Sequence, residues 1–254
     1  MSAQKLTFLA SDNTEAIEAK NLLKKNYSDV DLERADVVVA LGGDGFMLQT
    51  LHLVCKKSVP VYGMNKGTVG FLMNKFSETD LLNRIYLAKE EVVYPLKMIA
   101  TKSDESEEEG LAINEISLLR SGPQAAHLKI SVDGSLRLKE LVCDGALVCT
   151  PAGSTAYNYS AHGPILPIGA NILALTAMSA YRPRRWRGAL LPMDARIDIE
   201  IIDFAKRPVS AVADGAEVKN VKKVSILIEK KIEHRLLFDP GHGLEERLLK
   251  EQFE

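Results

Sequence analysis

The chain has 254 residues, of which 46% are hydrophobic, so it can bury a substantial core in one large domain or two smaller ones. The formal net charge of −2 excludes the overall basic field that attracts nucleic acid or an anionic membrane surface. An N-terminal segment that soon turns polar, and apolar stretches too short to cross a bilayer, predict a cytoplasmic protein that binds neither nucleic acid nor membrane.

Over residues 1–95, short apolar runs alternate with helical patterns. The predicted strands include "KLTFLA", "DVVVAL" and "VPVYGMN", and the predicted helices cover residues 15–25, 46–56 and 78–88. Alternation of this kind predicts a parallel sheet with crossover helices. The run at residues 37–41 has no polar alternation, which is typical of a strand covered on both faces.

Over residues 96–234, strand-like segments follow one another closely. They are "EISLLR", "AHLKISVD", "SLRLKEL", "ALVCTP", "ARIDIEII", "PVSAVAD" and "KVSILIEK", with "VDGS" as a hairpin signal between two of them. Residues 235–254 are predicted as a helix that completes the first domain, from the spacing of Leu244, Leu248 and Leu249. The predicted fold is therefore an α/β N-terminal domain with a parallel sheet plus an all-β C-terminal domain, α+β overall.

The second predicted strand ends in "GGDG", residues 42–45. A loop that leaves a parallel strand and enters a helix gathers unpaired N–H groups at the positive helix end, which suits a phosphate. Asp44 would repel phosphate oxygens unless it serves as a general base or holds a cation. The alternative is a strand-to-helix turn in which Asp44 caps the helix.

A second loop, "GMNKGTVGFL", follows the next predicted strand at residues 63–72. It would place Asn65 and Gly67 near the same sheet edge, where open α/β sheets bind ligands. The alternative is an ordinary turn. Phe46 either faces the phosphate site or packs inward on a helical stripe with Thr50 and Leu53; packing is the favoured interpretation.

Two further stretches carry polar side chains at strand ends. Asn114 and Glu115 stand together in "LAINEIS" and can offer hydrogen bonds to adenine or ribose. "CDGALVCTPAGSTAYNYSAHGPILP", residues 143–167, crowds small hydroxyl residues around Tyr157, which could stack on a base. The alternative for the second stretch is an N-capped helix rich in Ser and Thr.

Together these stretches resemble the NAD kinase family, including its bacterial members that use ATP or polyphosphate. The family's G-G-D-G, its N-E pair, its D-G followed by T-P-x-G-S-T-A-Y, and a later D-G occur here in order, at residues 42–45, 114–115, 144–157 and 214–215. The resemblance implies an enzyme that transfers the terminal phosphate of ATP or polyphosphate to the 2′-hydroxyl of the adenosine ribose of NAD, giving NADP. The acceptor is an alcohol group.

The resemblance also implies roles for single residues. Asp44 would be the catalytic base. The predicted NAD-binding residues are Asp44, Gly45, Asn114, Glu115, Asp144, Ala152, Thr155, Ala156, Tyr157, Asn158, Ser160 and Asp214. The predicted donor phosphate-binding residues are Gly42, Gly43, Gly45 and Asn65. No direct protein ligand to a metal is predicted, and Mg²⁺ would arrive with the donor phosphates.

Family members are homo-oligomers, dimers or tetramers, with the dinucleotide site completed across subunits. The exposed-looking "YRPRRWRG", residues 181–188, would make an intersubunit contact, guide anions, or form a solvated loop. Phe46 stands where many members have Thr, which leaves donor preference open, and Ala152 removes one possible hydroxyl contact. NADH acceptance, oligomer size, preferred metal and feedback regulation also stay open.

Two other function classes fit part of the pattern. Lipid or sugar kinases share G-G-D-G, and a non-catalytic NAD(P)-binding sensor could use the same fold. A hydroxyl-rich acceptor loop disfavours a lipid acceptor, and the presence of Asp44 disfavours the sensor.

Overall fold

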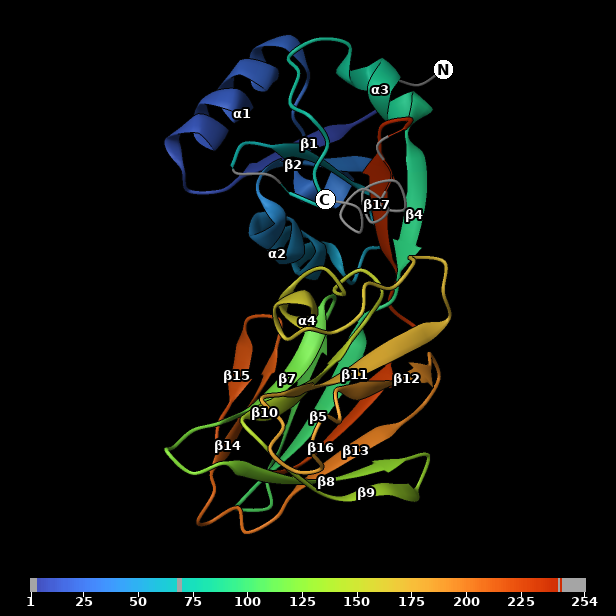
Figure 1. The fold of residues 1–254 in the computed structure, drawn as a ribbon. Coiled ribbons are helices and arrows are strands. Elements are labelled where there is room, and N and C mark those ends of the chain that lie inside the picture. The colour runs from blue at the N-terminus through green and yellow to red at the C-terminus, as the bar shows by residue number, and fades with distance from the viewer. Residues whose placement is uncertain (1–3, 68–69, 242, 244–254) are drawn as a thin grey trace. The chain divides into compact units, whose positions relative to one another are not determined.

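The structure is a computed structural model, and it describes residues 4–67, 70–241 and 243. The chain divides into two compact units (Figure 1). Unit 1 contains residues 1–93 and 231–254, and unit 2 contains residues 94–230. The α/β region with a parallel sheet and the β region that follows confirm the predicted fold class.

Unit 1 is built on a five-stranded sheet in the order β1-β2-β3-β17-β4. The strands are β1 (Leu6–Ala10), β2 (Val37–Gly42), β3 (Val61–Asn65), β17 (His234–Phe238) and β4 (Lys89–Val93). β1, β2, β3 and β17 run parallel along the sheet, and β4 pairs antiparallel with β17. Every residue of β2 is buried, as expected for a central parallel strand without polar alternation.

The described residues of unit 1 form three α-helices: α1 (Thr14–Asn26), α2 (Asp44–Val54) and α3 (Leu81–Leu87). A short 3₁₀ turn, η1 (Leu32–Arg34), precedes β2. α1 begins where the side chain of Asn13 accepts a hydrogen bond from the N–H of Ala16 at 2.7 Å, an N-cap. α3 begins later than predicted because Asp80 has φ of 61° and cannot continue a right-handed helix.

The predicted helix at residues 235–254 is wrong over its first residues. Residues 234–238 form β17, which enters the sheet between β3 and β4 and buries Leu236, Leu237 and Phe238. The backbone N–H and C=O groups of these residues pair with strands that are distant in the chain. A local sequence pattern does not indicate such distant partners. The rest of the prediction, including Leu244, Leu248 and Leu249, lies outside the described residues.

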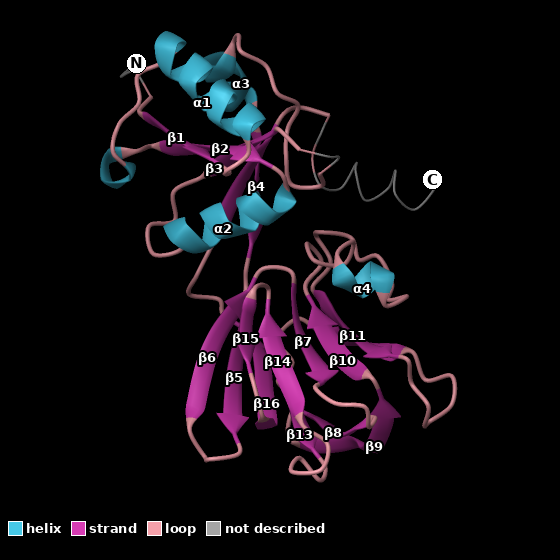
Figure 2. Ribbon diagram, turned by 90° about the vertical axis from the view of Figure 1, so that its left-hand side faces the viewer, coloured by secondary structure: helices cyan, strands magenta, loops and turns pink. Residues whose placement is uncertain are grey.

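Unit 2 contains two six-stranded sheets that share one hydrophobic core (Figure 2). The first has the order β12-β11-β10-β7-β14-β15: β12 (Gly188–Pro192), β11 (Ile172–Met178), β10 (Gly145–Cys149), β7 (Glu115–Arg120), β14 (Val209–Ala213) and β15 (Ala216–Val218). The second has the order β6-β5-β16-β13-β8-β9: β6 (Glu107–Ala112), β5 (Leu96–Lys102), β16 (Val221–Ile228), β13 (Ile197–Ile201), β8 (Ala126–Val132) and β9 (Ser135–Cys143). The four-residue helix α4 (Tyr157–Ser160) lies beyond the ends of β10 and β11, at one end of the sandwich (Figure 2).

Alternating burial explains the sandwich. In β8 and β13 every second residue is buried, so one face of each strand meets the core and the other faces water. The predicted "VDGS" turn joins β8 to β9, with Asp133 and Gly134 both at positive φ as a two-residue hairpin requires. Among the described residues, none of the helices has the length and apolar character to span a membrane.

Candidate phosphotransfer site

In unit 1 the two loops predicted to bind phosphate lie side by side. β2 ends at Gly42, which pairs with Asn65 at the end of β3. The backbone N–H of Lys66 donates to the carbonyl of Gly42 at 2.8 Å. α2 starts at Asp44, so the open N–H groups of its first turn stand at the edge that both strands reach.

The three glycines of "GGDG" have different surroundings. A Cβ on Gly42 would lie 2.9 Å from the Cβ of Phe46, so a side chain there would collide with the protein itself. A Cβ on Gly43 or Gly45 would meet nothing within 4 Å, and neither residue has positive φ. Neither packing nor backbone conformation therefore requires glycine at these two positions, and the space in front of them is open.

The carboxylate of Asp44 is held by the second loop. Its Oδ2 accepts the N–H of Phe71 at 2.7 Å and its Oδ1 accepts the N–H of Leu72 at 2.9 Å. A Cβ on Gly70 would lie 2.6 Å from Oδ1, so this glycine leaves room for the carboxylate. Each carboxylate oxygen keeps a further lone pair for a proton or a ligand.

The alternative in which Asp44 caps α2 is wrong. The N-cap residue is Gly43, and no side-chain capping bond is present there. Sequence analysis did not identify Phe71 and Leu72 as partners of Asp44, because their contribution is a backbone N–H. The glycines in "GTVGFL" were the only signal for it.

The predicted inward-facing stripe of Phe46, Thr50 and Leu53 is only partly confirmed. Leu53, assigned to the same inward stripe, is 60% exposed. The residues of α2 that are buried are Met47, Thr50, Leu51 and Val54. Phe46 is half-buried and lies against Gly42. It therefore packs against the loop at residues 42–45 (the glycine loop).

In unit 2 a second cluster forms where β7 begins. The carboxylate of Asp214 accepts the N–H groups of Ile113 at 2.8 Å and Asn114 at 3.0 Å, and the N–H of Asp214 donates to the carbonyl of Glu115 at 3.2 Å. Asp214 has φ of 46°, and these bonds hold it in that conformation. The later D-G of the sequence thus fixes the backbone of the N-E pair.

Glu115 is the most perturbed acid in this cluster. Burial, together with the nearby carboxylate of Asp214, raises the pKa of Glu115 from 4.5 to about 7, and a hydrogen bond from the backbone N–H of Tyr157 opposes the rise. Its Oε2 is buried with no hydrogen-bond partner among the described residues. A buried oxygen in that position is available to a ligand hydroxyl or amide.

The segment after β10 packs tightly on Asn114. The N–H of Thr150 donates to the carbonyl of Asn114 at 2.9 Å, and the Thr150 hydroxyl donates to the carbonyl of Ile113 at 2.7 Å. A Cβ on Gly153 would lie 2.2 Å from the carbonyl oxygen of Asn114, so only glycine fits. This contact joins the two predicted NAD-binding stretches, residues 114–115 and 150–160.

The predicted NAD-binding side chains of this segment separate into two groups. Asn158 is buried; its amide donates to the carbonyls of Ser154 and Pro164 and accepts the hydroxyl of Thr176. Ala152 is also buried. Those with surface to offer a ligand are Thr155, Ala156, Tyr157 and Ser160.

Asp144 does not join this cluster. It precedes β10, whereas Glu115 pairs with Cys149 at the other end of that strand, so about 17 Å separates them by the rise of a strand. The Asp144 carboxylate accepts a hydrogen bond from Nε of Arg120 at 2.6 Å.

Other reactive groups lie outside both clusters. In the described part of the chain, no three His, Cys, Asp or Glu side chains gather in a way that could hold a metal ion. Burial raises the pKa of the Cys143 and Cys149 thiols to about 12, which removes them as nucleophiles.

Comparison with known proteins identifies the family. The family model described as ATP-NAD kinase N-terminal domain matches residues 1–85, and that described as ATP-NAD kinase C-terminal domain matches residues 113–234. An NAD kinase of Cereibacter sphaeroides is 60% identical over 253 residues, covering 100% of both chains. The chain belongs to the NAD kinase family. An NAD kinase of Caulobacter vibrioides is 56% identical, covering 98% of this chain and 96% of the relative.

Solved NAD kinase structures share the fold at low identity. Yeast NADH kinase complexed with NADH matches with a TM-score of 0.83 at 23% identity, covering 98% of this chain and 87% of that chain. An NAD kinase from Archaeoglobus fulgidus in complex with ATP matches with a TM-score of 0.77 at 22% identity, covering 97% and 98%. The family resemblance read from the sequence is confirmed.

Proposed function

We propose that this chain is an NAD kinase that transfers the terminal phosphate of ATP to the 2′-hydroxyl of the adenosine ribose of NAD, with Asp44 as the general base. The observation that carries the proposal is the open space at Gly43 and Gly45 next to a carboxylate oriented by two backbone N–H groups. Membership of the NAD kinase family supports the choice of acceptor.

The proposed step moves one proton and one phosphoryl group. A free lone pair on an Asp44 oxygen takes the proton of the 2′-hydroxyl. At the same time the 2′-oxygen of the ribose bonds to the terminal phosphorus of the donor. The bond from phosphorus to the bridging oxygen breaks, and ADP leaves with the electron pair. The N–H groups of Gly43 and Gly45 would hold the donor phosphates, with Gly42 and Asn65 completing the loop.

On the acceptor side, we assign NAD to residues of unit 2. The buried Oε2 of Glu115 would bind a hydroxyl of the adenosine part, and Tyr157, with 38% of its surface exposed, would stack on a base. Thr155, Ala156 and Ser160 would line the same site. Asp214, Asn158 and Ala152 would act by holding the segments in place, which refines their predicted role as NAD-binding residues.

Magnesium fits as an ion carried by the donor. Mg²⁺ prefers oxygen ligands and binds through one or two carboxylates plus substrate phosphates, and Asp44 is a single carboxylate beside the glycine loop. When bound, the ion would neutralise charge on the phosphates.

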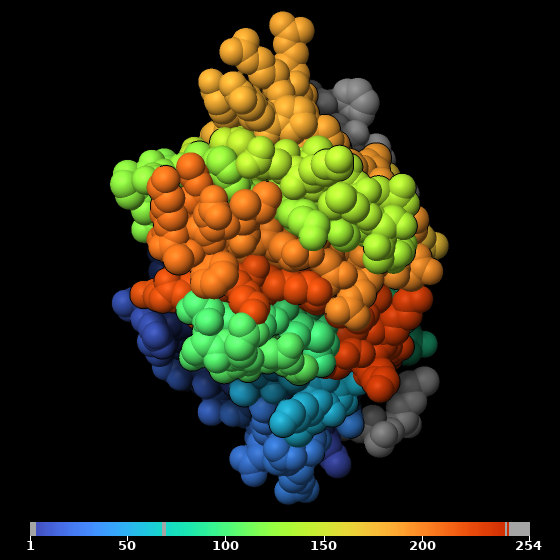
Figure 3. All heavy atoms as spheres, turned by 90° about the horizontal axis from the view of Figure 1, so that it is seen from below, coloured from blue at the N-terminus to red at the C-terminus, as the bar shows by residue number. Residues whose placement is uncertain are grey.

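We further propose a homo-oligomer in which Asp144 serves the NAD site of a neighbouring copy. The separation of about 17 Å between Asp144 and Glu115 along β10 supports this assignment. The segment at residues 181–187 exposes arginines 182, 184, 185 and 187. In Figure 3 a golden segment, whose colour falls near residue 180 on the bar, projects from the surface. It offers cationic groups to a second copy.

The test of the activity is direct. Purified chain incubated with NAD, ATP and Mg²⁺ should form NADP, and the Asp44→Asn variant should form it far more slowly. A lipid or sugar kinase would leave NAD unchanged, and a non-catalytic sensor would bind NAD without turnover. Either result would contradict the proposal.

A further inference from the structure

Asn74 joins two strands of the unit 1 sheet, β3 and β17, and is fully buried. Its backbone pairs with β3: its N–H donates to the carbonyl of Gly63 at 2.8 Å, and its carbonyl accepts the N–H of Asn65 at 2.8 Å. Its side chain pairs with the end of β17: Nδ2 donates to the carbonyl of Leu237 at 2.8 Å, and Oδ1 accepts the N–H of Asp239 at 2.9 Å. Backbone and side chain of one residue therefore hold the two strands together.

This link lies where β3 and β17 cease to pair with each other. The register of the two strands contains one pair, Leu236 with Val61. Beyond it, the backbone groups of residues 63–65 and 237–239 need other partners, because a buried unpaired backbone group is costly. An asparagine suits this place, since its amide is both a donor and an acceptor. A carboxylate could not donate to the Leu237 carbonyl, and an aliphatic side chain could bond neither strand group.

The segment fastened by Asn74 carries the donors to Asp44. Phe71 and Leu72, whose N–H groups bind the Asp44 carboxylate, precede Asn74 by only a few residues. At about 3.3 Å per residue, both donors lie within about 10 Å of Asn74 along the chain. Leu72 and Met73 are buried, so close packing restrains the chain between the donors and Asn74.

The partner of Asn74 at the end of β17 is itself fixed. The Asp239 carboxylate accepts the Tyr62 hydroxyl at 2.6 Å and forms an ion pair with Arg84. Tyr62 is a fully buried residue of β3, and Arg84 lies on α3. The hold on Asn74 therefore depends on β3, on α3 and on the residues that end β17.

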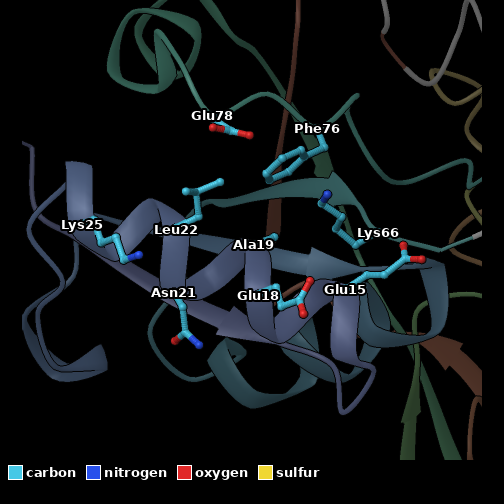
Figure 4. A pocket seen from close by; sticks show the side chains of 9 residues that line it. All are labelled: Glu15, Glu18, Ala19, Asn21, Leu22, Lys25, Lys66, Phe76 and Glu78. Carbon is cyan, nitrogen blue, oxygen red and sulfur yellow. The ribbon is translucent and has the colours of Figure 1, made fainter.

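A second contact lies on the side of the same loop that is nearer to solvent. The Nζ of Lys66 is 3.6 Å from the centroid of the Phe76 ring, and Figure 4 shows the two side chains facing each other. Both side chains are only half-buried, so water and salt weaken this cation–π contact. The buried amide of Asn74 is the firmer restraint on residues 70–74.

We propose that Asn74 is a positioning residue for phosphoryl transfer: it fixes the N–H groups of Phe71 and Leu72, and through them the Asp44 carboxylate. The inference rests on the proposed function, because it concerns the proposed general base. Loss of the link would leave the substrate-binding residues in place and misalign the base. A misplacement of about 1 Å can cost about a hundred-fold in rate.

Steady-state kinetics of NADP formation by the full chain test the proposal. Asn74→Ala should lower kcat about ten-fold or more and change the KM for NAD and for ATP by less than about two-fold. The effect should disappear in the Asp44→Asn background, because a residue that acts through the base has nothing to position once the base is lost. An equal loss from Asn74→Ala in both backgrounds would overturn the positioning role.

Two controls separate positioning from stability. Ile85→Ala removes buried apolar contacts of α3 and should lower the melting temperature without the loss in kcat. Asn21→Ala replaces an exposed asparagine of α1 whose side chain points away from Phe76 (Figure 4), and it should match the wild type. A fall in kcat in Ile85→Ala as large as that in Asn74→Ala would assign the effect to stability and overturn the proposal.

Hydrogen exchange reads the same link without turnover. In the wild-type chain the amides of Phe71 and Leu72 should exchange within about ten-fold of the rate of the β2 amides, and in Asn74→Ala at least about ten-fold faster than in the wild type. Fast exchange of these two amides in the wild type would overturn the proposal even if Asn74→Ala failed to fold. A wild-type chain that protects them but forms no NADP would contradict the kinase activity alone.

Discussion

The carboxylate of Asp44 accepts the backbone N–H of Phe71 at 2.7 Å, across 27 residues of sequence. This bond and its partner from Leu72 orient a carboxylate that would otherwise rotate at the start of α2. A base must be aligned with the proton that it removes, and two fixed donors supply that alignment without using its remaining lone pairs.

Replacing Asp44 should therefore abolish chemistry and preserve binding. In Asp44→Asn an amide cannot take the proton, so we expect turnover to fall by roughly a hundred-fold or more, with NAD affinity within a few-fold of wild type. Steady-state NADP formation and NAD titration measure the two. Asp31→Asn, an exposed aspartate of the same unit, is the control and should be fully active. Near-normal turnover in Asp44→Asn would remove the base assignment.

Substitutions at Gly42 and Gly45 should have opposite effects on the free energy of unfolding. Gly42→Ala places a Cβ 2.9 Å from the Cβ of Phe46, and overpacking of this kind should cost about 1–3 kcal/mol of unfolding free energy. Gly45→Ala meets no protein atom and should raise stability by up to about 1 kcal/mol, while the added methyl group obstructs the donor phosphates. Thermal melts and the KM for ATP report both effects. Unchanged ATP kinetics in Gly45→Ala would show that no phosphate approaches there.

Glu115 should make stability depend on pH. Its pKa is raised to about 7 in the folded chain, so the folded state holds a proton that the unfolded state releases near pH 4.5. The stabilisation is complete below pH 4.5 and is lost as pH rises through 7. Glu115→Gln stays neutral, so the stability difference between variant and wild type should shift in favour of the variant by up to about 3 kcal/mol between pH 5 and pH 8.

Urea denaturation at the two pH values, without NAD, measures this difference. Glu107→Gln replaces an exposed glutamate of unit 2 and should show no such shift. A constant difference between Glu115→Gln and wild type would show that Glu115 has an ordinary pKa.

Substitutions at two neighbouring residues of α4, Tyr157 and Asn158, should change different properties: the KM for NAD and the free energy of unfolding. Tyr157→Ala removes an exposed ring and should raise the KM for NAD with little change in melting temperature. Asn158→Ala leaves the buried Thr176 hydroxyl and two carbonyls without their partner, so it should lower the unfolding free energy by about 2–4 kcal/mol. A Tyr157→Ala variant that weakens ATP binding instead would place Tyr157 on the donor side.

Self-association should be visible in solution and should need the segment at residues 181–187. Sedimentation velocity is expected to show a dimer or tetramer, and the double variant Arg184→Glu, Arg185→Glu should shift it towards monomer with reduced activity. Lys129→Glu, Lys139→Glu is the matched control elsewhere on unit 2. A fully active monomeric wild type would contradict the oligomer and the role of Asp144 in a neighbouring site.

Much of the fold follows from patterns that are local in the sequence. The apolar run of β2, the helical spacing of α1 and the "VDGS" turn each specify their own element, because periodicity and turn chemistry act over a few residues. The glycine loop after β2 and the N-E pair at the start of β7 could be found for the same reason, since the signal of each lies in adjacent residues.

Other features were decided by which distant segments come together. Nothing in residues 234–238 marks them as a strand between β3 and β4, and that position depends on backbone partners far along the chain. Asp44 acquires its orientation from two N–H groups that have no side-chain signature, and Asp144 is separated from Glu115 because β10 is an extended strand. The sequence by itself determined the classes of element and the chemical groups; tertiary packing decided which groups are buried, oriented and within reach, because those properties depend on long-range pairing.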